Sequence, residues 1–271
     1  MQLTRHDTST GPRWAADSQW LTRHFTLSHL MEVPAHAAHR LVQGCLTSDP
    51  ASGQLLAPVE SATEVWAAGV TYLRSREARM QESDTADVYD KVYDAERPEV
   101  FFKCAGWRAR GPDQAIRIRR DATWNVPEPE LALVSNAGGE IIGYTAGNDV
   151  SSRDIEGANP LYLPQAKVYD GSCSLGPSII IATPDSMRDV PIRLTITRAG
   201  ETMFEGQTGI SQMKRTLEEL VECLYSEIEF PAGSVLLTGA GIVPPDEFTL
   251  TVGDHVRIEV GSLVLNNVVE S

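Results

Sequence analysis

Two glutamates separated by a single proline are the most distinctive acidic feature of this sequence. Glu128 and Glu130 lie in residues 126–131, where Pro127 and Pro129 rule out a helix interior because proline lacks a backbone N–H donor. In an extended chain, side chains two residues apart point the same way, so both carboxylates lie on one face. Two such like charges repel unless a cation lies between them. The pattern predicts a divalent-metal site; the alternative is a pair of solvated acids at the start of a strand.

A third carboxylate favours the metal site. Asp149 ends an alternating stretch that follows the apolar residues 131–134 and the turn residues Asn-Ala-Gly-Gly at 136–139. A hairpin brings its two open ends to the same end of a sheet, so we expect Asp149 to return beside Glu130. Such a carboxylate set suits a hard cation that prefers oxygen ligands, namely Mg²⁺, with Mn²⁺ or Ca²⁺ as substitutes. Arg153, four residues on, is a bidentate donor for a carboxylate of the protein or of a substrate.

Three further residues are candidates for chemistry. Lys167 is a single lysine in an otherwise uncharged stretch, and its alternative role is that of an exposed lysine. Glu99 stands between Pro98 and the apolar residues 100–102, a setting that would raise the pKa of its carboxyl toward neutrality. Thr238 precedes a Gly-Ala-Gly turn whose N–H groups could hold an anion.

The histidines leave the central region empty. None falls between residues 40 and 254, since all lie near the ends, at His6, His24, His29, His36, His39 and His255. A Ser-His-Asp or Cys-His mechanism would need a histidine from one of these ends. Acid–base work in the centre is therefore expected from carboxylates, lysine, tyrosine or a metal.

Composition limits the classes of function. With 23 Lys+Arg against 37 Asp+Glu among 271 residues, the formal net charge is −14, which disfavours general nucleic-acid binding. No apolar run approaches the roughly 18 residues that cross a bilayer, and the N-terminus lacks the apolar core of a signal peptide. We therefore expect a cytoplasmic protein with no membrane or nucleic-acid partner. The four cysteines are far apart and form no CxxC pair, so free thiols are expected.

One basic cluster departs from the acidic average. It is expected to be a solvated strand edge or a subunit contact, or else a surface that attracts an anionic substrate, and it comprises Arg108, Arg110, Arg117, Arg119 and Arg120.

The elements that must position these residues are mainly strands. Residues 65–70, 131–134, 141–144 and 192–197 read as strands, and the end of the chain is again β. Residues 76–98 are charged and predict helix, and a second helix carries an apolar stripe from Leu217 to Ile228 with Ser211 as its N-cap. The fold class is α+β, mainly β, with a small N-terminal domain over residues 1–60 and a catalytic domain over residues 61–271.

Over residues 60–271 the sequence resembles the fumarylacetoacetate hydrolase family. The motifs that carry the resemblance occur in family order: GVTY at 69–72, FFK at 101–103, EPELALV at 128–134, GY at 143–144, NDVSSRD at 148–154, QAK at 165–167, LGP at 175–177 and TG at 238–239. The resemblance implies a mixed β-sandwich roll that is dimeric or larger. It also implies that Glu128, Glu130 and Asp149 bind Mg²⁺ or Mn²⁺, and that Arg153 and Lys167 contact substrate or support catalysis.

A narrower likeness points to the 2-keto-3-deoxy-pentonate (arabinonate/xylonate) dehydratase branch. It rests on residues 66–72, 75–79, 97–99 and 155–165. The hydrolytic branches carry a histidine near the position of Ser75, and its absence here argues against hydrolysis by a histidine-activated water.

The expected activity is the Mg²⁺-dependent dehydration of a small 2-oxo acid, 4,5-dihydroxy-2-oxopentanoate, to 2-oxoglutarate semialdehyde in oxidative pentose degradation, by a homodimer or homotetramer. Glu99 and Lys167 are expected to transfer protons, in an order left open, while Ser75, Arg79, Arg153 and Thr238 contact the substrate. The alternatives within the family are acylpyruvate hydrolysis, 2-oxo-diene isomerisation or hydration, and oxaloacetate decarboxylation.

Overall fold

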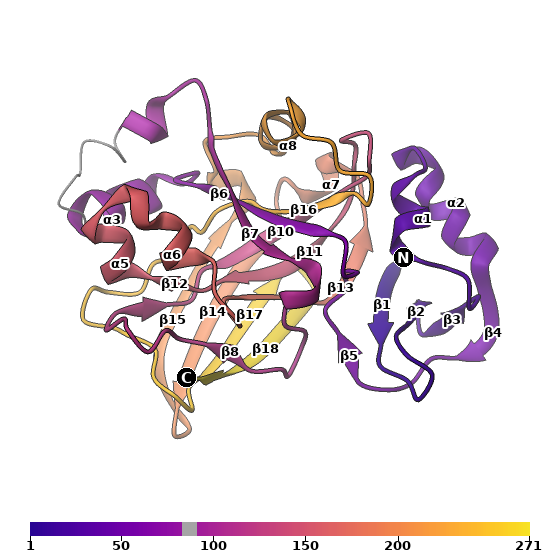
Figure 1. Cartoon of the computed structure of the whole chain (residues 1–271), viewed down its shortest axis with the longest axis horizontal. Helices are drawn as coiled ribbons and strands as arrows, with labels where there is room; N and C mark the ends of the chain where they lie inside the picture. The colour runs from indigo at the N-terminus through magenta and orange to yellow at the C-terminus, as the bar shows by residue number, and fades with distance from the viewer. Residues whose placement is uncertain (83–90) are drawn as a thin grey trace.

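The computed structural model describes residues 1–82 and 91–271, and its strands form two main sheets (Figure 1). Within the described residues, the larger sheet has 11 strands. Its order is β4 (Leu46–Pro50), β3 (Gln19–Leu21), β2 (Arg13–Ala16), β1 (Gln2–His6), β13 (Cys173–Ile181), β11 (Ile141–Asp149), β10 (Pro129–Ser135), β16 (Ser234–Leu237), β6 (Glu64–Gly69) and β7 (Glu99–Ala105), with β5 (Leu55–Leu56) paired to β1.

The smaller main sheet has 5 strands in the described residues and packs against the larger one. Its order is β15 (Glu201–Gly209), β14 (Pro191–Arg198), β17 (His255–Val260), β18 (Leu263–Glu270) and β8 (Ile116–Arg117). A separate short pair joins β9 (Asn125–Val126) to β12 (Ser151–Ser152).

Alternation along β10 divides the hydrophobic core into two layers. Leu131 and Leu133 belong to the cluster that packs against the 5-stranded sheet, whereas Ala132 and Val134 belong to a second cluster shared with residues 1–60. Successive side chains of a strand point to opposite faces, so a continuous apolar run covers both. The expected mainly-β, α+β sandwich is therefore confirmed.

Residues 1–60 attach to the central sheet through β1. This strand pairs antiparallel with β13, with Gln2 opposite Ile180, and it is covered by α1 (Leu27–Met31) and α2 (Ala35–Cys45) (Figure 1). The first helix is capped by the Thr26 side chain, which accepts a hydrogen bond from the N–H of His29. The division into two domains at residue 60 stays a prediction.

Three of the remaining helices lie together. On the opposite side of the molecule from α1 and α2, Figure 1 shows α3, α5 and α6 gathered together. The bounds of the described helices after α2 are α3 (Leu73–Glu82), η1 (Gly106–Arg108), α5 (Arg153–Ala158), η2 (Pro160–Tyr162), α6 (Leu163–Lys167), α7 (Pro184–Met187), η3 (Ile210–Gln212) and α8 (Leu217–Tyr225). The helical prediction over residues 76–98 lies partly outside the described residues.

The predicted N-cap of α8 is wrong. Ser211 lies in η3, and the helix begins after Thr216, whose side chain accepts from the N–H of Glu219 while the Glu219 side chain accepts from the N–H of Thr216. This reciprocal pair is a capping box. Ile228, expected in the apolar stripe, lies beyond the helix and is 39% exposed.

The cysteines are free in the structure, as expected. Cys104 and Cys173 are buried, and Cys45 and Cys223 are half-buried. Among the described residues, no helix combines the length and the apolar character needed to cross a membrane.

Candidate metal centre and active site

The β10–β11 hairpin brings the three predicted acids together. Pro129 pairs with Asn148 and Glu130 with Gly147, so Asp149 follows at the end where β10 begins, and its N–H donates to the carbonyl of Glu128 over 2.9 Å. Ligand oxygens of Glu128, Glu130 and Asp149 all lie within 4.8 Å of one another, and all three side chains are buried. The alternative interpretation, solvated acids at a strand start, is wrong.

Glu130 occupies the deepest position of the three. One carboxylate oxygen, Oε2, accepts a hydrogen bond of 2.5 Å from the N–H of Gly239, while Oε1 is buried and accepts no hydrogen bond from the described residues. Burial, together with the negative charges of Asp149 and Glu128, raises the pKa of Glu130 well above its usual range. A buried oxygen of this kind, beside two more carboxylates, fits a divalent cation with hard oxygen ligands.

Lys167 lies at the end of α6 and contacts two of the acids. Its Nζ is 2.8 Å from Oε2 of Glu128 and 3.1 Å from Oδ2 of Asp149, and it donates to Oγ of Ser151 over 2.5 Å. The side chain is buried, so the alternative of an exposed lysine is wrong.

A second lysine, Lys103, lies behind the acids on β7. Its side chain forms a buried ion pair with Asp149, and it donates to the carbonyls of Val150 (3.0 Å) and Lys167 (2.6 Å). This residue ends the FFK motif at 101–103, but the motif alone assigns it no function. Its signal is a single lysine after the apolar residues 100–102 of the strand Glu99–Ala105, because a lysine is rarely buried unless it is paired.

Arg153 connects the acids to the helix α5. Its Nη2 lies 2.9 Å from Oε1 of Glu128, and its Nη1 lies 3.7 Å from Oε2 of Glu156, one turn further along the same helix. Both side chains are buried. Glu156 was also missed as a candidate, although its position three residues after Arg153 puts both on one helix face.

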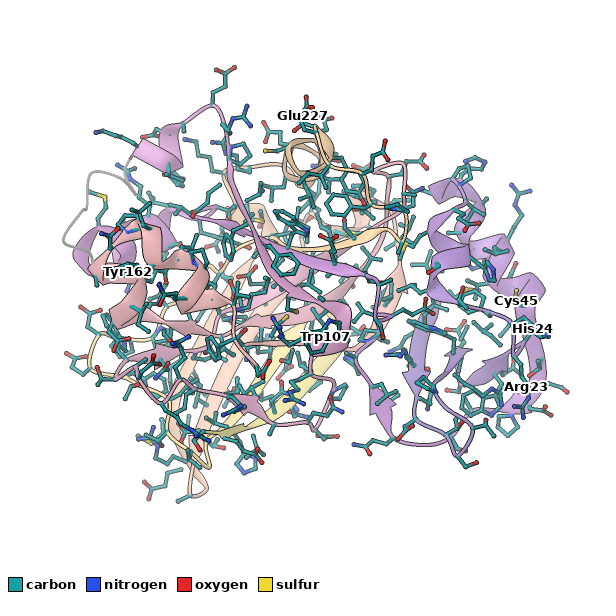
Figure 2. The ribbon with its side chains drawn as sticks, in the orientation of Figure 1. Arg23, His24, Cys45, Trp107, Tyr162 and Glu227 are labelled. Carbon is teal, nitrogen blue, oxygen red and sulfur yellow. The ribbon has the colours of Figure 1, made fainter. Side chains whose placement is uncertain are left out.

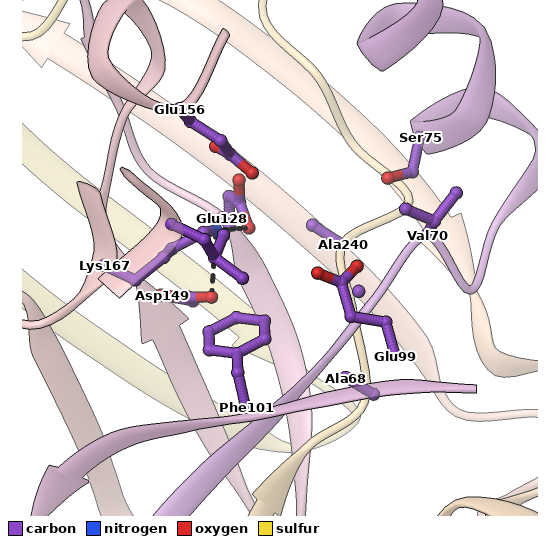
Figure 3. Close-up of a pocket in the computed structure, with 12 residues that line it drawn as sticks. Ala68, Val70, Ser75, Glu99, Phe101, Glu128, Asp149, Glu156, Lys167 and Ala240 are labelled. Atoms are coloured by element: carbon purple, nitrogen blue, oxygen red, sulfur yellow. Dashed lines mark hydrogen bonds and ion pairs between the residues drawn. The ribbon is translucent and has the colours of Figure 1, made fainter. Parts of the chain in front are cut away.

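Four of these residues, Glu128, Asp149, Glu156 and Lys167, line a small pocket, which Figure 3 shows in close-up. Its volume is ≈ 20 Å³, room for about one water molecule or ion. It is lined by Ala68, Gly69, Val70, Ser75, Glu99, Phe101, Glu128, Asp149, Glu156, Leu163, Lys167 and Ala240.

The other predicted substrate contacts differ in their placement. Ser75, expected to contact the substrate, and Glu99, expected to transfer a proton, both line the pocket. Thr238 is buried beneath it, and its hydroxyl donates to the carbonyl of Leu131 over 2.9 Å. The side chain of Arg79 lies outside the described residues. For all four, contact with a substrate stays a prediction.

Two arginines of the basic cluster form ion pairs with acids on the surface. Arg108 lies 3.2 Å from Asp170, and Arg119 lies 2.6 Å from Asp121. Exposed pairs of this kind suit the expected solvated strand edge.

Comparison with known proteins agrees with this geometry. Residues 64–270 match the family described as "Fumarylacetoacetate (FAA) hydrolase C-terminal". The chain is 50% identical over 206 residues to a probable 2-keto-3-deoxyxylonate dehydratase of Haloferax volcanii, which covers 75% of this chain and 70% of that protein. It is 42% identical over 208 residues to 2-dehydro-3-deoxy-D-arabinonate dehydratase of Saccharolobus solfataricus, covering 74% and 69% of the two chains.

A solved structure resembles the whole fold. A 2-keto-3-deoxy-D-arabinonate dehydratase complexed with magnesium and 2,5-dioxopentanoate superposes with a TM-score of 0.85 at 32% identity, covering 100% of this chain and 99% of that one. The resemblance drawn from the sequence motifs, including the narrower likeness to the dehydratase branch, is confirmed. The chain belongs to the fumarylacetoacetate hydrolase family.

Proposed function

We propose that the protein is a Mg²⁺-dependent dehydratase that converts 4,5-dihydroxy-2-oxopentanoate, a 2-keto-3-deoxy-pentonate, to 2,5-dioxopentanoate and water in oxidative pentose degradation. One observation carries the proposal: the buried carboxylates of Glu128 and Asp149, which lie within 4.8 Å of that of Glu130, line a pocket together with Glu99 and Lys167. The 50% identity to a probable 2-keto-3-deoxyxylonate dehydratase supports the choice of substrate.

Glu128, Glu130 and Asp149 would hold the metal. When bound, Mg²⁺ supplies Lewis-acid polarisation of the 2-oxo acid carboxylate and carbonyl, which makes the neighbouring C3 protons more acidic. The structural relative complexed with magnesium supports this choice of cation.

The chain's own residues supply the proton transfers. Dehydration removes a proton from C3 and the hydroxyl from C4, so a base and an acid must both reach the substrate. Glu99 and Lys167 line the pocket and are proposed for these transfers. Ser75, Arg79, Arg153 and Thr238 are proposed to bind the substrate's carboxylate or hydroxyl groups.

The substrate proposal is tested by parallel assays. Purified protein with Mg²⁺ is incubated with 4,5-dihydroxy-2-oxopentanoate, with oxaloacetate and with an acylpyruvate. We expect 2,5-dioxopentanoate from the first and no turnover of the other two. If only oxaloacetate or only the acylpyruvate is turned over, the protein has another activity of the family and the dehydratase proposal is wrong.

The site is tested by two variant sets. The double variant Glu128→Gln, Glu130→Gln should fold but neither bind Mg²⁺ nor turn over substrate, and wild-type activity after chelator treatment would disprove the metal site. Glu99→Gln and Lys167→Ala should slow deuterium exchange at C3. Unchanged exchange and turnover in both would remove them from the mechanism. Glu227→Gln, an exposed glutamate labelled in Figure 2, is the matched control and should behave as wild type.

We further propose that the protein acts in the cytoplasm as a homodimer or homotetramer. Exposed large apolar side chains support an assembly, among them Trp107 at 64% and Leu161 at 83% exposure. Light scattering of the purified protein tests this, and a monomer at working concentration would contradict it.

A further inference from the structure

Glu156 lines the pocket from the helix α5. Figure 3 shows its carboxyl group entering the pocket across from Glu99, the first residue of β7. Glu156 is only 4% exposed. A buried carboxyl that faces a pocket has given up most of its contact with water, so it is placed for a ligand or for a neighbouring charge.

Arg153 is one charge beside Glu156. Its guanidinium lies 3.7 Å from Glu156 and 2.9 Å from Glu128, and the shorter distance is typical of a direct hydrogen bond between such groups, about 2.7–2.9 Å. Arg153 therefore contacts both Glu128 and Glu156. Glu156 lies next to the three acids Glu128, Glu130 and Asp149 but is not one of them.

The proposed dehydration needs more than a base. Hydroxide is a poor leaving group, so the C4 oxygen must receive a proton as its bond to carbon breaks. The base that takes the C3 proton and the acid that serves the C4 oxygen act on adjacent carbons and approach from different directions. Carboxyl groups on two walls of one pocket meet this requirement.

We infer that Glu156 is a further catalytic residue that acts on the leaving group, an inference that rests on the proposed function. Its carboxyl group hydrogen-bonds to the C4 hydroxyl and donates the proton. The base takes the C3 proton, the electron pair of the C3–H bond becomes the C3–C4 double bond, and that of the C4–O bond stays on oxygen. The oxygen leaves as water, and Glu156 is left as a carboxylate that a proton from solvent restores. The alkene then tautomerises to 2,5-dioxopentanoate: the C5 carbon and its hydroxyl each lose a proton, and C3 and C4 each gain one.

The test separates the two halves of the reaction in Glu156→Gln, which keeps the size of the side chain and an oxygen for Arg153. C3 deuterium exchange is followed on 2-oxopentanoate, which has no leaving group. Dehydration is followed on 4,5-dihydroxy-2-oxopentanoate. We expect exchange and Mg²⁺ affinity close to wild type, with dehydration lowered by about 100-fold or more.

A third substrate tests whether activity returns when the leaving group no longer needs a full proton transfer. In the 4-fluoro analogue, fluoride replaces the C4 hydroxyl and departs without a full proton transfer. Fluoride release by Glu156→Gln should therefore approach that of the wild type, whereas Glu99→Gln or Lys167→Ala should not be rescued. If Glu156→Gln does not fold, Glu156→Ala takes its place, with the same loss of dehydration and retained exchange expected.

The outcomes are distinct. Wild-type dehydration by Glu156→Gln, or equal loss of exchange, metal affinity and fluoride release, would overturn the inference and leave a structural role beside Arg153. Failure of the wild type to dehydrate the substrate would instead overturn the proposed function. The exposed Glu227→Gln controls for the loss of one carboxylate.

Discussion

The ammonium group of Lys103 is paired with Asp149 in a contact that solvent hardly reaches, with side chains 0% and 2% exposed. Lys103 also donates to the backbone carbonyl of Lys167. One buried side chain thus fixes both an acid of the candidate metal centre and the backbone of Lys167, which is proposed for proton transfer. Lys103 is buried and fully engaged by these partners. It therefore positions the site although it does not line the pocket.

Replacing Lys103 by methionine should be strongly destabilising. The change keeps most of the volume but removes one of the two lysines that pair with the buried carboxylate of Asp149 and leaves it with Lys167. Breaking a buried ion pair from one side costs about 3–5 kcal/mol. Chemical denaturation measures the loss. The matched control is Arg257→Met, whose partner Glu259 is at the surface, with side chains 46% and 31% exposed, and its midpoint should hardly move. Equal stability of the two variants would contradict the prediction.

Replacing Gly69 by alanine should abolish activity with little effect on the fold. Gly69 pairs with Glu99 across β6 and β7, and an added Cβ would lie 2.0 Å from Oε2 of Glu99. The end of that side chain can swing away, so the fold and Mg²⁺ binding survive while Glu99 leaves its place. A loss of turnover of about 100-fold is expected.

Melting curves, Mg²⁺ titration and turnover of Gly69→Ala separate these effects. Gly44→Ala is the control, since an added Cβ there meets nothing within 4 Å. Full activity in Gly69→Ala would show that Glu99 does not need its present position.

The stability of metal-free protein should depend on pH through Glu130. Its pKa is raised in the folded state, first by burial. A carboxyl with a raised folded pKa favours folding below its unfolded pKa of about 4.3, and this contribution is lost as pH rises through the raised value. Glu130→Gln cannot ionise, so it should become more stable than the wild type as pH rises through this window.

Denaturation midpoints measured with chelator across this pH range test the expectation. Addition of Mg²⁺ should make the wild type more stable than Glu130→Gln, because only the wild type retains all three carboxylates. A stability difference that stays constant with pH would count against an ionising Glu130.

The corrected cap of α8 makes a separate prediction. Thr216→Ala removes the side chain that accepts from the N–H of Glu219 and should cost about 1 kcal/mol of stability. Ser211→Ala, at the position expected from the sequence, should change nothing measurable. Urea midpoints of the two variants decide between the caps.

The sequence predicted the placement of Glu128, Glu130 and Asp149 well, because that placement depends on residues that are close together in the chain. The i, i+2 spacing places Glu128 and Glu130 on one face, and a short hairpin returns Asp149 to them. Thr216 was missed although its signal is local too: a glutamate follows it three residues later, the pattern of a capping box.

Contacts between residues that are far apart in the chain could not be predicted in this way. Nothing near Lys103 in sequence shows that it meets Asp149, because the contact depends on how β7 and β11 are brought together by other strands. The pairing of β1 with β13 joins residues that are equally far apart in the sequence, so no local pattern predicts that β1 extends the larger sheet.

The parallel pairing of β16 with β6 sets Leu237 beside Ala67 and brings Gly239 to Glu130. Contacts between such distant parts of a chain form slowly, because a long loop must close before they contribute. During synthesis, the three acids leave the ribosome well before the donor that holds one of them. We therefore expect the metal centre to be completed late in folding, and a chain that stops short of β16 to carry the acids without a working site.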